Sequence, residues 1–464
     1  MKKISMFFNS FLPLTLLLSV YHLYGAPANT VVATINVGVN PAGLAITPDG
    51  KYAYVANNND YRIAGQDSVS VLDLSTNLPL TTINHASFNE PYTITLNATG
   101  TKAYVTNSNS TTITIIDTAT NTVSGTIGGF DGPSGMVITP GGVLAYVNNY
   151  GGPGGVGSGN GNTVRVVDLN TNTIVGAAIT VGQAPAALAI SPNGAHVYSI
   201  NYVDGNPGTA TISVIRTSDN TVVATINGFS GPFGIAITPD GSSAYVANFG
   251  SNNFFPFGTT VGVVNLNNNT LTTNVTVGIQ PSGIAITPDG RLAYVSNYDT
   301  LYTDTTTFNQ ITAGQGTVNI IDIATNKVLP PTIPVDQSPA NIAISPNGAY
   351  AYVTNYTSNT VNVIALQTFQ IVAQGCKIRN TFLTESEIVN KITWTVSGGM
   401  LPISYSIYRD AQLTDLAGIV AATEPFVFLD GKRNPNTTYT YYIVGTNAVG
   451  TTSVPVAVPV TSYC

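Results

Sequence analysis

The sequence predicts an all-β protein: a seven-bladed β-propeller of four-stranded blades, followed by a β-sandwich domain. Three observations lead to this expectation: the composition, a hairpin that recurs seven times, and a change of pattern at residue 376. Only 8% of the 464 residues are charged, against roughly 25% in a typical globular domain. Strand and turn residues dominate instead, so little of the chain favours helices.

The hairpin is clear in the stretch from Pro281 to Asp299, which reads PSGIAITPDGRLAYVSNYD. A short apolar run is followed by a Thr-Pro-Asp-Gly turn and by a second apolar run that ends in Tyr-x-x-Asn. Proline presets φ in such a turn, and glycine tolerates a positive φ. Seven prolines open the copies: Pro41, Pro91, Pro133, Pro185, Pro232, Pro281 and Pro339.

These prolines are 42 to 58 residues apart, a period typical of propellers and solenoids. The sixth copy contains four predicted strands, at 283–287, 292–297, 317–322 and 327–333. Four antiparallel strands per repeat are typical of a propeller blade. Since one blade cannot bury both of its faces, seven blades in a ring explain the repetition.

Ring closure is predicted from a duplicated octapeptide. Residues 29–36 and 220–227 both read NTVVATIN, and the second copy is the expected outer strand of the fourth blade. The first copy has no blade of its own, so we expect it to complete the last blade. Residues 368–374, TFQIVAQ, are the alternative closing strand.

The first 25 residues are expected to be a signal peptide. Lys2 and Lys3 precede an apolar stretch at 11–20, and cleavage fits between Gly25 and Ala26. This stretch is shorter than the ~20 residues of a membrane span, and no later segment is long and apolar enough. The mature protein, with the propeller at 26–375, is therefore expected to be exported to the periplasm, the cell surface or the medium.

Residues 376–464 alternate at period two and predict the sandwich. Cys376 and Cys464 bracket this domain, and export would permit a disulfide between them. However, the first and last strands of a seven-stranded sandwich run parallel, which would separate these residues by on the order of 20 Å, against ~7 Å between the Cα atoms of a disulfide. The pairing therefore stays open at this point.

Two resemblances follow from these motifs. Residues 30–375 resemble the YVTN-type, surface-layer-like seven-bladed propeller repeats, with the motif literal at Tyr104–Asn107 and Tyr352–Asn355. Residues 434–439, followed by VGTNAVGT, resemble the late strands of fibronectin type III domains. The resemblance to the YVTN-type repeats implies an extracytoplasmic location and binding or surface roles, and it supplies no shared catalytic motif.

Catalytic candidates are scarce. The expected mature chain contains His85 and His196, and the propeller contains a single glutamate, Glu90. His85 and Glu90 share one blade-to-blade connection and are the weak acid–base candidates, although a structural role is favoured, because no third group is visible and a lone surface histidine is ordinary. No spacing of His, Cys and Asp indicates zinc, and no cofactor is expected.

Recurring aspartates end the predicted third strands, where turn capping explains them and calcium binding is the alternative. They are Asp73, Asp117, Asp168 and Asp322. The seven Tyr-x-x-Asn asparagines are expected to fix the ends of the second strands. Residues 26–375 carry 7 Lys and Arg against 16 Asp and Glu, a net charge of −9 that disfavours nucleic-acid binding.

Aromatic residues recur in the long loops between the second and third strands of blades three to six. If exposed, they would form a ligand-binding surface; the alternative is that they fold inward and pack the loops. The candidates are Tyr150, Tyr202, Phe249, Phe254, Phe255, Phe257, Tyr298, Tyr302 and Phe308.

Three functions follow as hypotheses. The first is an exported binding or adhesion protein whose loop-rich propeller face recognises a glycan or a protein. The second is a hydrolase or lyase acting on a lactone or sugar, which would need His85, Glu90 and a basic residue to converge. The third is a structural component of a surface layer.

Overall fold

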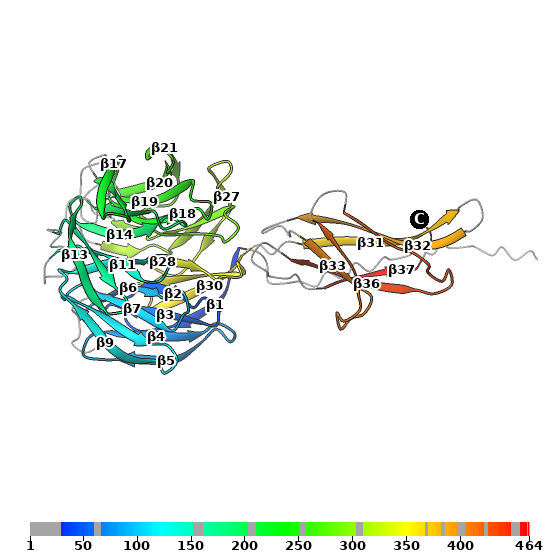
Figure 1. The fold of residues 1–464 in the computed structure, drawn as a ribbon, viewed down its shortest axis with the longest axis horizontal. Helices are drawn as coiled ribbons and strands as arrows, with labels where there is room; N and C mark the ends of the chain where they lie inside the picture. The colour runs from blue at the N-terminus through cyan, green and yellow to red at the C-terminus, as the bar shows by residue number, and fades with distance from the viewer. Residues whose placement is uncertain are drawn as a thin grey trace, which may run out of the picture.

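The structure is a computed structural model that describes residues 29–59, 66–151, 161–202, 210–250, 257–302, 310–366, 370–381, 386–397, 404–421, 426–446, 455–461 and 463. These residues form β-strands and no helix. Seven four-stranded sheets make a propeller, and two further sheets make a separate sandwich (Figure 1). The predicted fold class is therefore confirmed.

Each blade is an antiparallel sheet, and in blades 1 to 6 its four strands follow one another in chain order. Blade 1 contains β2 (Pro41–Ile46), β3 (Tyr52–Asn57), β4 (Ser68–Asp73) and β5 (Leu78–Asn84). Blade 2 contains β6 (Pro91–Leu96), β7 (Lys102–Asn107), β8 (Thr112–Asp117) and β9 (Thr122–Gly128). Blade 3 contains β10 (Pro133–Ile138), β11 (Leu144–Asn149), β12 (Thr163–Asp168) and β13 (Thr173–Thr180). Blade 4 contains β14 (Pro185–Ile190), β15 (His196–Asn201), β16 (Ala210–Arg216) and β17 (Thr221–Phe229).

Blade 5 contains β18 (Pro232–Ile237), β19 (Ser243–Gly250), β20 (Phe257–Asn265) and β21 (Thr270–Thr276). Blade 6 contains β22 (Pro281–Ile286), β23 (Leu292–Asn297), β26 (Thr317–Asp322) and β27 (Lys327–Pro334), with the small hairpin β24 (Thr300–Tyr302) and β25 (Gln310–Ala313) inserted between β23 and β26. Blade 7 contains β28 (Pro339–Ile344), β29 (Tyr350–Asn355) and β30 (Thr360–Ala365), and β1 (Thr30–Asn36) is its outer strand.

The turn chemistry agrees with the prediction. In blade 1 the Thr47 hydroxyl donates to Asp49 at 2.6 Å, and Gly50 adopts φ 70°. Asp73 accepts the amide of Ser75 at 2.8 Å, so the aspartate caps the turn after the third strand. Asp117, Asp168 and Asp322 accept backbone amides in the same way.

The asparagine that ends each second strand ties that strand to the third strand of its own blade. Asn57 donates from Nδ2 to the Ser68 hydroxyl at 3.1 Å, and Asn107 donates to Thr112 at 3.2 Å. The other five make the equivalent bond: Asn149 to Thr163, Asn201 to Thr211, Asn248 to Thr260, Asn297 to Thr317 and Asn355 to Thr360. The predicted role of the asparagines is confirmed.

The tyrosine of the same motif links neighbouring blades. Tyr54 in blade 1 donates its hydroxyl to Asn121 Oδ1, in the last turn of blade 2, at 2.6 Å. Tyr146 bonds Asn220, and Tyr245 bonds Asn326, each at 2.6 Å. This role of the tyrosine is not predicted from the sequence.

β1 closes the ring, as predicted. It pairs antiparallel with β30 from Thr30↔Ala365 to Asn36↔Thr360. Asn29, just before β1, accepts the Tyr294 hydroxyl at 3.0 Å and has φ 57°, which is also the φ of Asn220. The duplicated octapeptide therefore repeats a structural role as well as a sequence.

The alternative closing strand belongs to the sandwich instead. β31 (Gln370–Thr381) crosses the expected domain boundary at 375/376 and pairs with β32 (Ser386–Ser397), which pairs with β35 (Val427–Asp430). The second sheet has the order β34 (Leu416–Ala421), β33 (Ser404–Tyr408), β36 (Tyr439–Thr446) and β37 (Val456–Val460). Trp394, Tyr405 and Tyr441 pack between the two sheets.

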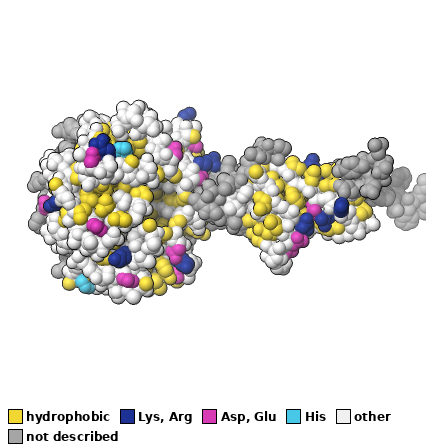
Figure 2. All heavy atoms as spheres, in the orientation of Figure 1, with side chains coloured by type: hydrophobic (Ala, Val, Ile, Leu, Met, Phe, Trp, Pro, Cys, Tyr) yellow, Lys and Arg dark blue, Asp and Glu magenta, His cyan; other side chains and the backbone are white. Residues whose placement is uncertain are grey.

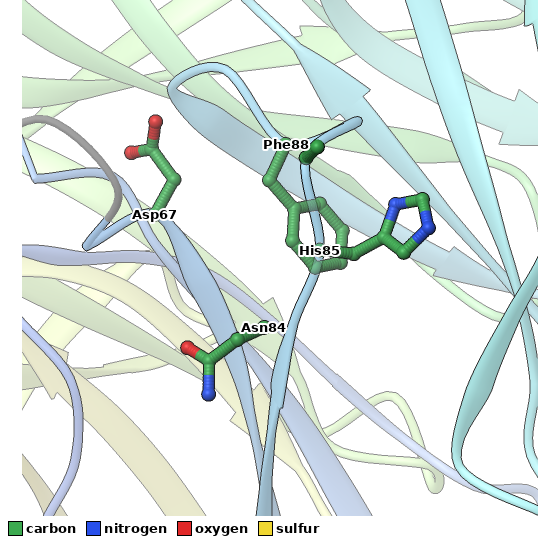
Figure 3. A pocket seen from close by; sticks show the side chains of 5 residues that line it. Asp67, Asn84, His85 and Phe88 are labelled. Carbon is green, nitrogen blue, oxygen red and sulfur yellow. The ribbon is translucent and has the colours of Figure 1, made fainter.

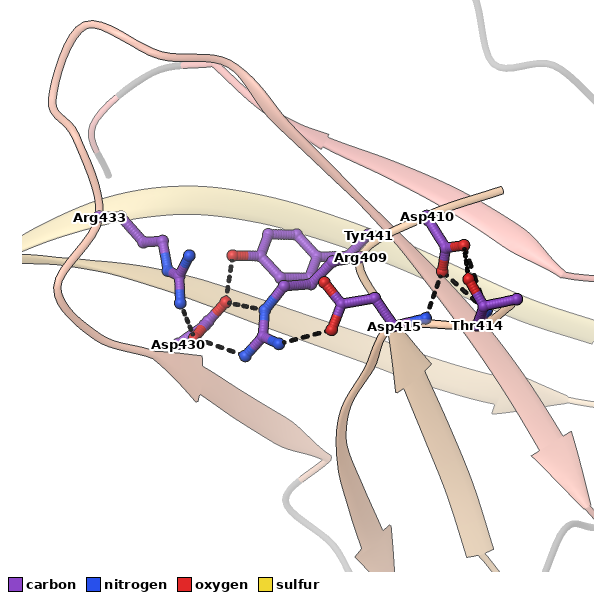
Figure 4. A network of polar contacts seen from close by, with 7 residues as sticks. All are labelled: Arg409, Asp410, Thr414, Asp415, Asp430, Arg433 and Tyr441. Carbon is purple, nitrogen blue, oxygen red and sulfur yellow. Dashed lines mark hydrogen bonds and ion pairs between the residues drawn. The ribbon is translucent and has the colours of Figure 1, made fainter. Parts of the chain in front are cut away.

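One carboxylate organises polar contacts in the sandwich (Figure 4). Asp430 accepts from Arg409 at 3.0 Å, from Arg433 at 2.9 Å and from the Tyr441 hydroxyl at 2.7 Å. Burial by itself would raise the pKa of Asp430, but these donors outweigh it and hold the pKa below its usual value. The network joins both sheets.

The geometric objection to a disulfide was wrong. Cys376 is disulfide-bonded, and the chain has one other cysteine, Cys464. Cys376 lies in the middle of β31 rather than at its start, and a parallel bridge places Tyr463 beside Lys377. β31 thus continues past Cys376 toward the end of the sandwich at which the chain leaves β37.

The expected signal peptide lies outside the described residues. In the part of the chain that the structure describes, no helix is long and apolar enough to cross a membrane.

Candidate functional site: the mouth of the ring

One face of the propeller carries the ends of the second strands and the connections from each blade to the next; we call it the mouth face. In every blade, the residue after the Tyr-x-x-Asn asparagine donates its amide to the carbonyl of the residue that precedes the opening proline of the same blade. Examples are Tyr150 to Gly132 at 3.0 Å, Tyr202 to Ala184 at 2.9 Å and Tyr298 to Gln280 at 2.9 Å.

The residue before each opening proline has a positive φ, between 49° and 56°, in all seven blades. Only Gly132 and Gly231 are glycines; the others are Asn40, Glu90, Ala184, Gln280 and Ser338. A left-handed conformation is uncommon for such residues and usually reflects a structural or functional demand. Here it turns the chain so that the residue after each second strand is fixed at the mouth.

Aromatic rings from successive blades meet at this position. Phe233 on β18 packs edge-to-face against Tyr202 of blade 4, with ring centroids 6.4 Å apart. The centroids of Phe233 and Phe249 are 5.4 Å apart, and those of Phe249 and Tyr298 of blade 6 are 5.9 Å apart. These spacings are typical of favourable aromatic pairs, so the rings form a continuous row across three blades.

Tyr92 on β6 extends this group toward blade 2. Burial raises the pKa of Tyr92, and the nearby hydroxyls of Tyr150, Tyr202 and Tyr298 raise it further. The Tyr92 hydroxyl is therefore within electrostatic range of the phenol groups of blades 3, 4 and 6. We call these six residues the mouth cluster: Tyr92, Tyr150, Tyr202, Phe233, Phe249 and Tyr298.

The structure divides the predicted ligand-binding aromatics. Tyr202 is 6% exposed and Phe249 is 5% exposed, so these two fold inward, which is the alternative that the sequence left open. Tyr150, Phe257 and Tyr298 are half-buried. Phe254, Phe255 and Phe308 lie outside the described residues, as does the side chain of Tyr302 on β24.

Two members of the mouth cluster were missed by the sequence analysis. Tyr92 and Phe233 directly follow the opening prolines Pro91 and Pro232, on the first strands of blades 2 and 5. The signal was present, because the other five blades have alanine or serine at this position: Ala42, Ser134, Ala186, Ser282 and Ala340.

His85, one of the two weak acid–base candidates, lines an open hollow of ≈ 450 Å³ together with Asp67, Asn84 and Phe88; Glu90 is not among its described lining residues. In Figure 3 the His85 imidazole and the Asp67 carboxylate point away from each other. His85 is exposed, whereas Glu90 is 4% exposed. Burial thus differs sharply between the two residues.

A local chain of hydrogen bonds fixes His85. Its Nδ1 accepts the amide of Ser87 at 3.1 Å and lies 2.8 Å from the Ser87 hydroxyl. The Thr114 hydroxyl donates to Ser87 Oγ at 3.0 Å. With Nδ1 accepting from a backbone amide, the neutral ring carries its proton on Nε2.

Asp67 was not among the predicted site residues. Its carboxylate accepts the Glu90 amide at 3.3 Å, which lowers its pKa, but burial has the larger effect and raises the pKa of Asp67 above its usual value. A carboxyl group with a raised pKa in a hollow is a recognisable signal of a site, but it depends on burial that the sequence does not display. Among the described residues, no group of three His, Cys, Asp or Glu side chains could hold a metal ion.

Comparison with known proteins agrees with this architecture. Residues 25–140 and 173–381 match the family model described as "Lactonase, 7-bladed beta-propeller". A solved structure, "Kuenenia stuttgartiensis Hydrazine Synthase", superposes with a TM-score of 0.59 over 74% of this chain and 99% of that chain. At 20% sequence identity, this likeness concerns the fold alone.

Two curated proteins of Mycobacterium tuberculosis are similar in sequence. The "PE-PGRS family protein PE_PGRS18" is 50% identical over 60 residues, 13% of this chain, and the "Seven-bladed beta-propeller protein Rv1057" is 33% identical over 169 residues, 36% of this chain. These alignments span 13% and 39% of the relatives' own lengths.

Proposed function

Since the chain belongs to the seven-bladed β-propeller lactonase family, we propose that it uses this ring for binding, as an exported adhesion or surface-interaction protein that recognises a glycan or a protein at the mouth face. The observation that carries the proposal is the mouth cluster. Six aromatic residues from blades 2 to 6 gather where the ring opens, and the partly exposed members rest on the buried Tyr202 and Phe249. Rigid aromatic rings provide large contact areas at a low cost in conformational entropy.

The remainder of the chain suits presentation of such a face. β30 ends on the side of the propeller opposite the mouth face, and β31 begins at Gln370, so the chain leaves the ring away from the proposed site (Figure 1). The sandwich has sheets β31-β32-β35 and β34-β33-β36-β37, and the Tyr439 hydroxyl accepts the Asn434 amide at 3.1 Å. These features support a fibronectin type III-like spacer with a tyrosine corner, and the YVTN motifs support a surface location.

The test uses the full chain on arrays of glycans and of surface proteins. We expect the double variant Tyr150→Ser, Tyr298→Ser to lose binding and to retain the melting temperature of the wild type, because both side chains are half-buried. Tyr350→Ser is the matched control, since Tyr350 is 38% exposed at the other end of its blade. Binding that survives the double variant would disprove a role for the mouth cluster.

Hydrolysis of a lactone or sugar is the second candidate. The family description and the pairing of Ser87 with His85 at 2.8 Å favour it. If the chain releases acid from any of a panel of lactones and His85→Ala abolishes this release, the activity is established.

A structural role in a surface layer would instead appear as ordered assembly of the purified chain.

A further inference from the structure

One lysine of the sandwich is buried. On the face drawn in Figure 2, charged side chains are few and lie scattered over the surface. Lys377 on β31 is instead 3% exposed, and it is the only buried Lys or Arg among the residues that the structure describes. Its Nζ donates to the carbonyl of Pro435 at 2.8 Å and makes no ion pair with a described carboxylate. A buried ammonium group with so little compensation is destabilising.

The register of the sheet places an asparagine directly opposite this lysine. Lys377 pairs with Asn390 on β32, and Asn390 pairs in turn with Asp430 on β35. Asn390 shares one face of β32 with Ile392 and Trp394, which belong to the core, so its side chain faces the interior. Opposed residues of antiparallel strands have Cβ atoms about 4.5 to 5.5 Å apart. The flexible four-carbon stem of lysine spans such a separation.

The amide of Asn390 is only half satisfied. The residue is 0% exposed, and its Oδ1 has no hydrogen-bond partner among the described residues. Its Nδ2 donates to the Tyr441 hydroxyl at 2.9 Å, and that hydroxyl donates to Asp430 at 2.7 Å (Figure 4). Because Tyr441 gives its proton to Asp430, its oxygen accepts from Asn390, which fixes the amide nitrogen on the Tyr441 side. The buried acceptor Oδ1 is left without a donor, which is destabilising.

We propose that Lys377 and Asn390 join in an intramolecular isopeptide bond. Nζ bonds to Cγ of Asn390, the Cγ–Nδ2 bond breaks, and Nδ2 leaves as ammonium. The lysine ammonium keeps one proton on the new amide nitrogen and gives two to the leaving nitrogen, so atoms and charge balance without an oxidant or a cofactor. This modification goes beyond the proposed binding function and does not depend on it.

The surroundings of the pair favour this reaction. The bond replaces a buried charge with a neutral amide. Two reacting groups held side by side by the strand register react as if at a very high concentration. Tyr441, held by Asp430, contacts the nitrogen that leaves and positions the amide. Nζ has only to exchange the Pro435 carbonyl, in the exposed connection between β35 and β36, for the neighbouring Cγ.

The bond would strengthen the strand that connects the sandwich to the propeller. β31 is the first strand after the ring, and its Cys376 already forms a disulfide next to Lys377. The isopeptide bond would fasten β31 to β32 independently of that disulfide. We therefore expect β31 and β32 to stay covalently joined in the reduced protein.

The test measures the mass of the full chain after reduction and denaturation. We expect a mass lower by one ammonia than the mass calculated from the sequence. A tryptic digest should then contain residues 380–391 joined to the segment that ends at Arg379, without cleavage after Lys377, because trypsin does not cleave after an acylated lysine. An unchanged mass overturns the inference. A loss of ammonia without joined peptides also overturns it, since that result indicates only a succinimide at an asparagine.

Variants assign the bond to these two residues. Lys377→Arg and Asn390→Ala should each keep the full calculated mass, and Lys377→Arg should also lower the melting temperature of the sandwich. Lys391→Arg, at the next position of β32, is the matched control and should lose ammonia as the wild type does. Loss of ammonia in Lys377→Arg overturns the assignment. The mass of the wild type decides the question even if a variant fails to fold.

The role of Tyr441 is tested by the rate of the reaction. In Tyr441→Phe the amide nitrogen loses its partner, so the cross-linked form should accumulate more slowly, as followed by mass at intervals after synthesis. A purely structural role would lower the melting temperature and leave this rate unchanged, which would refute Tyr441 as a positioning residue.

Discussion

At the residue scale, the repeated motif has two separate functions in the fold. Its asparagine joins the second and third strands within a blade, whereas its tyrosine reaches the next blade. Four tyrosines make this second bond: Tyr54, Tyr146, Tyr245 and Tyr294. In the other turns Asn77, Asn172 and Asn269 have a buried Oδ1 with no partner among the described residues. The inter-blade bond is therefore not uniform around the ring.

Tyr54→Phe tests the energetic value of this bond. Burial raises the pKa of Tyr54 to about 12, so the hydroxyl stays protonated and donates to Asn121 at neutral pH. We expect the free energy of unfolding to fall by about 1 kcal/mol, measured by chemical denaturation. Tyr104→Phe is the control, because Asn172 at the corresponding turn position has no partner; an equal loss in both variants would contradict the assignment.

At the element scale, β1 completes a blade whose other three strands come from the far end of the propeller sequence. Ile35 packs with Leu44, Val361 and Val363, so β1 contributes to the apolar contact between blades 7 and 1. All six residues of β30 are buried, and β1 pairs with this strand from Thr30↔Ala365 to Asn36↔Thr360. Closure thus protects an apolar strand that would otherwise be an edge.

Deletion of residues 1–37 should therefore destabilise the ring and promote association through the exposed edge of β30. The measurements are the melting temperature and the mass in solution. A chain that begins at residue 29, just before β1, is the control and should behave as the full chain does. If both truncations melt alike and remain monodisperse, β1 does not hold the ring closed.

At the scale of the whole molecule, the propeller and the sandwich have separate apolar cores. The core cluster of the sandwich contains Trp394, Tyr405 and Tyr441 and no propeller residue. Each unit should then unfold in its own transition. The Asp430 network links the two sheets within the sandwich, so its effects belong to that transition alone.

Asp430→Asn should lower the free energy of unfolding of the sandwich by about 3 kcal/mol and leave that of the propeller unchanged. The reason is that it leaves Arg409 and Arg433 without a buried partner. The folded-state pKa of Asp430 lies below the value of ~3.9 for an unfolded aspartate. The stabilisation is therefore complete above this value and is lost as pH falls through the lower folded pKa. Calorimetry at neutral pH and below pH ~4 measures both effects, and a sandwich transition with the same pH dependence in the variant would contradict the prediction.

The sequence by itself determined the repeating architecture of this protein. Blades, turns and the closing strand follow from local chemistry: a proline and a glycine set each turn, and the duplicated NTVVATIN reveals the displaced outer strand. The turns are readable because each depends on residues close together in the chain, and the closing strand is readable because its octapeptide recurs at 220–227.

Only the tertiary structure decided which side chains share one site. Tyr92, Tyr202 and Tyr298 come from three different blades, and ring geometry alone brings them to one mouth. It also decided that Tyr202 and Phe249 are buried, and that Cys376 lies far enough along β31 to form its disulfide. Burial and distance between remote segments depend on the closure of the ring and the register of the strands, and no local pattern encodes them.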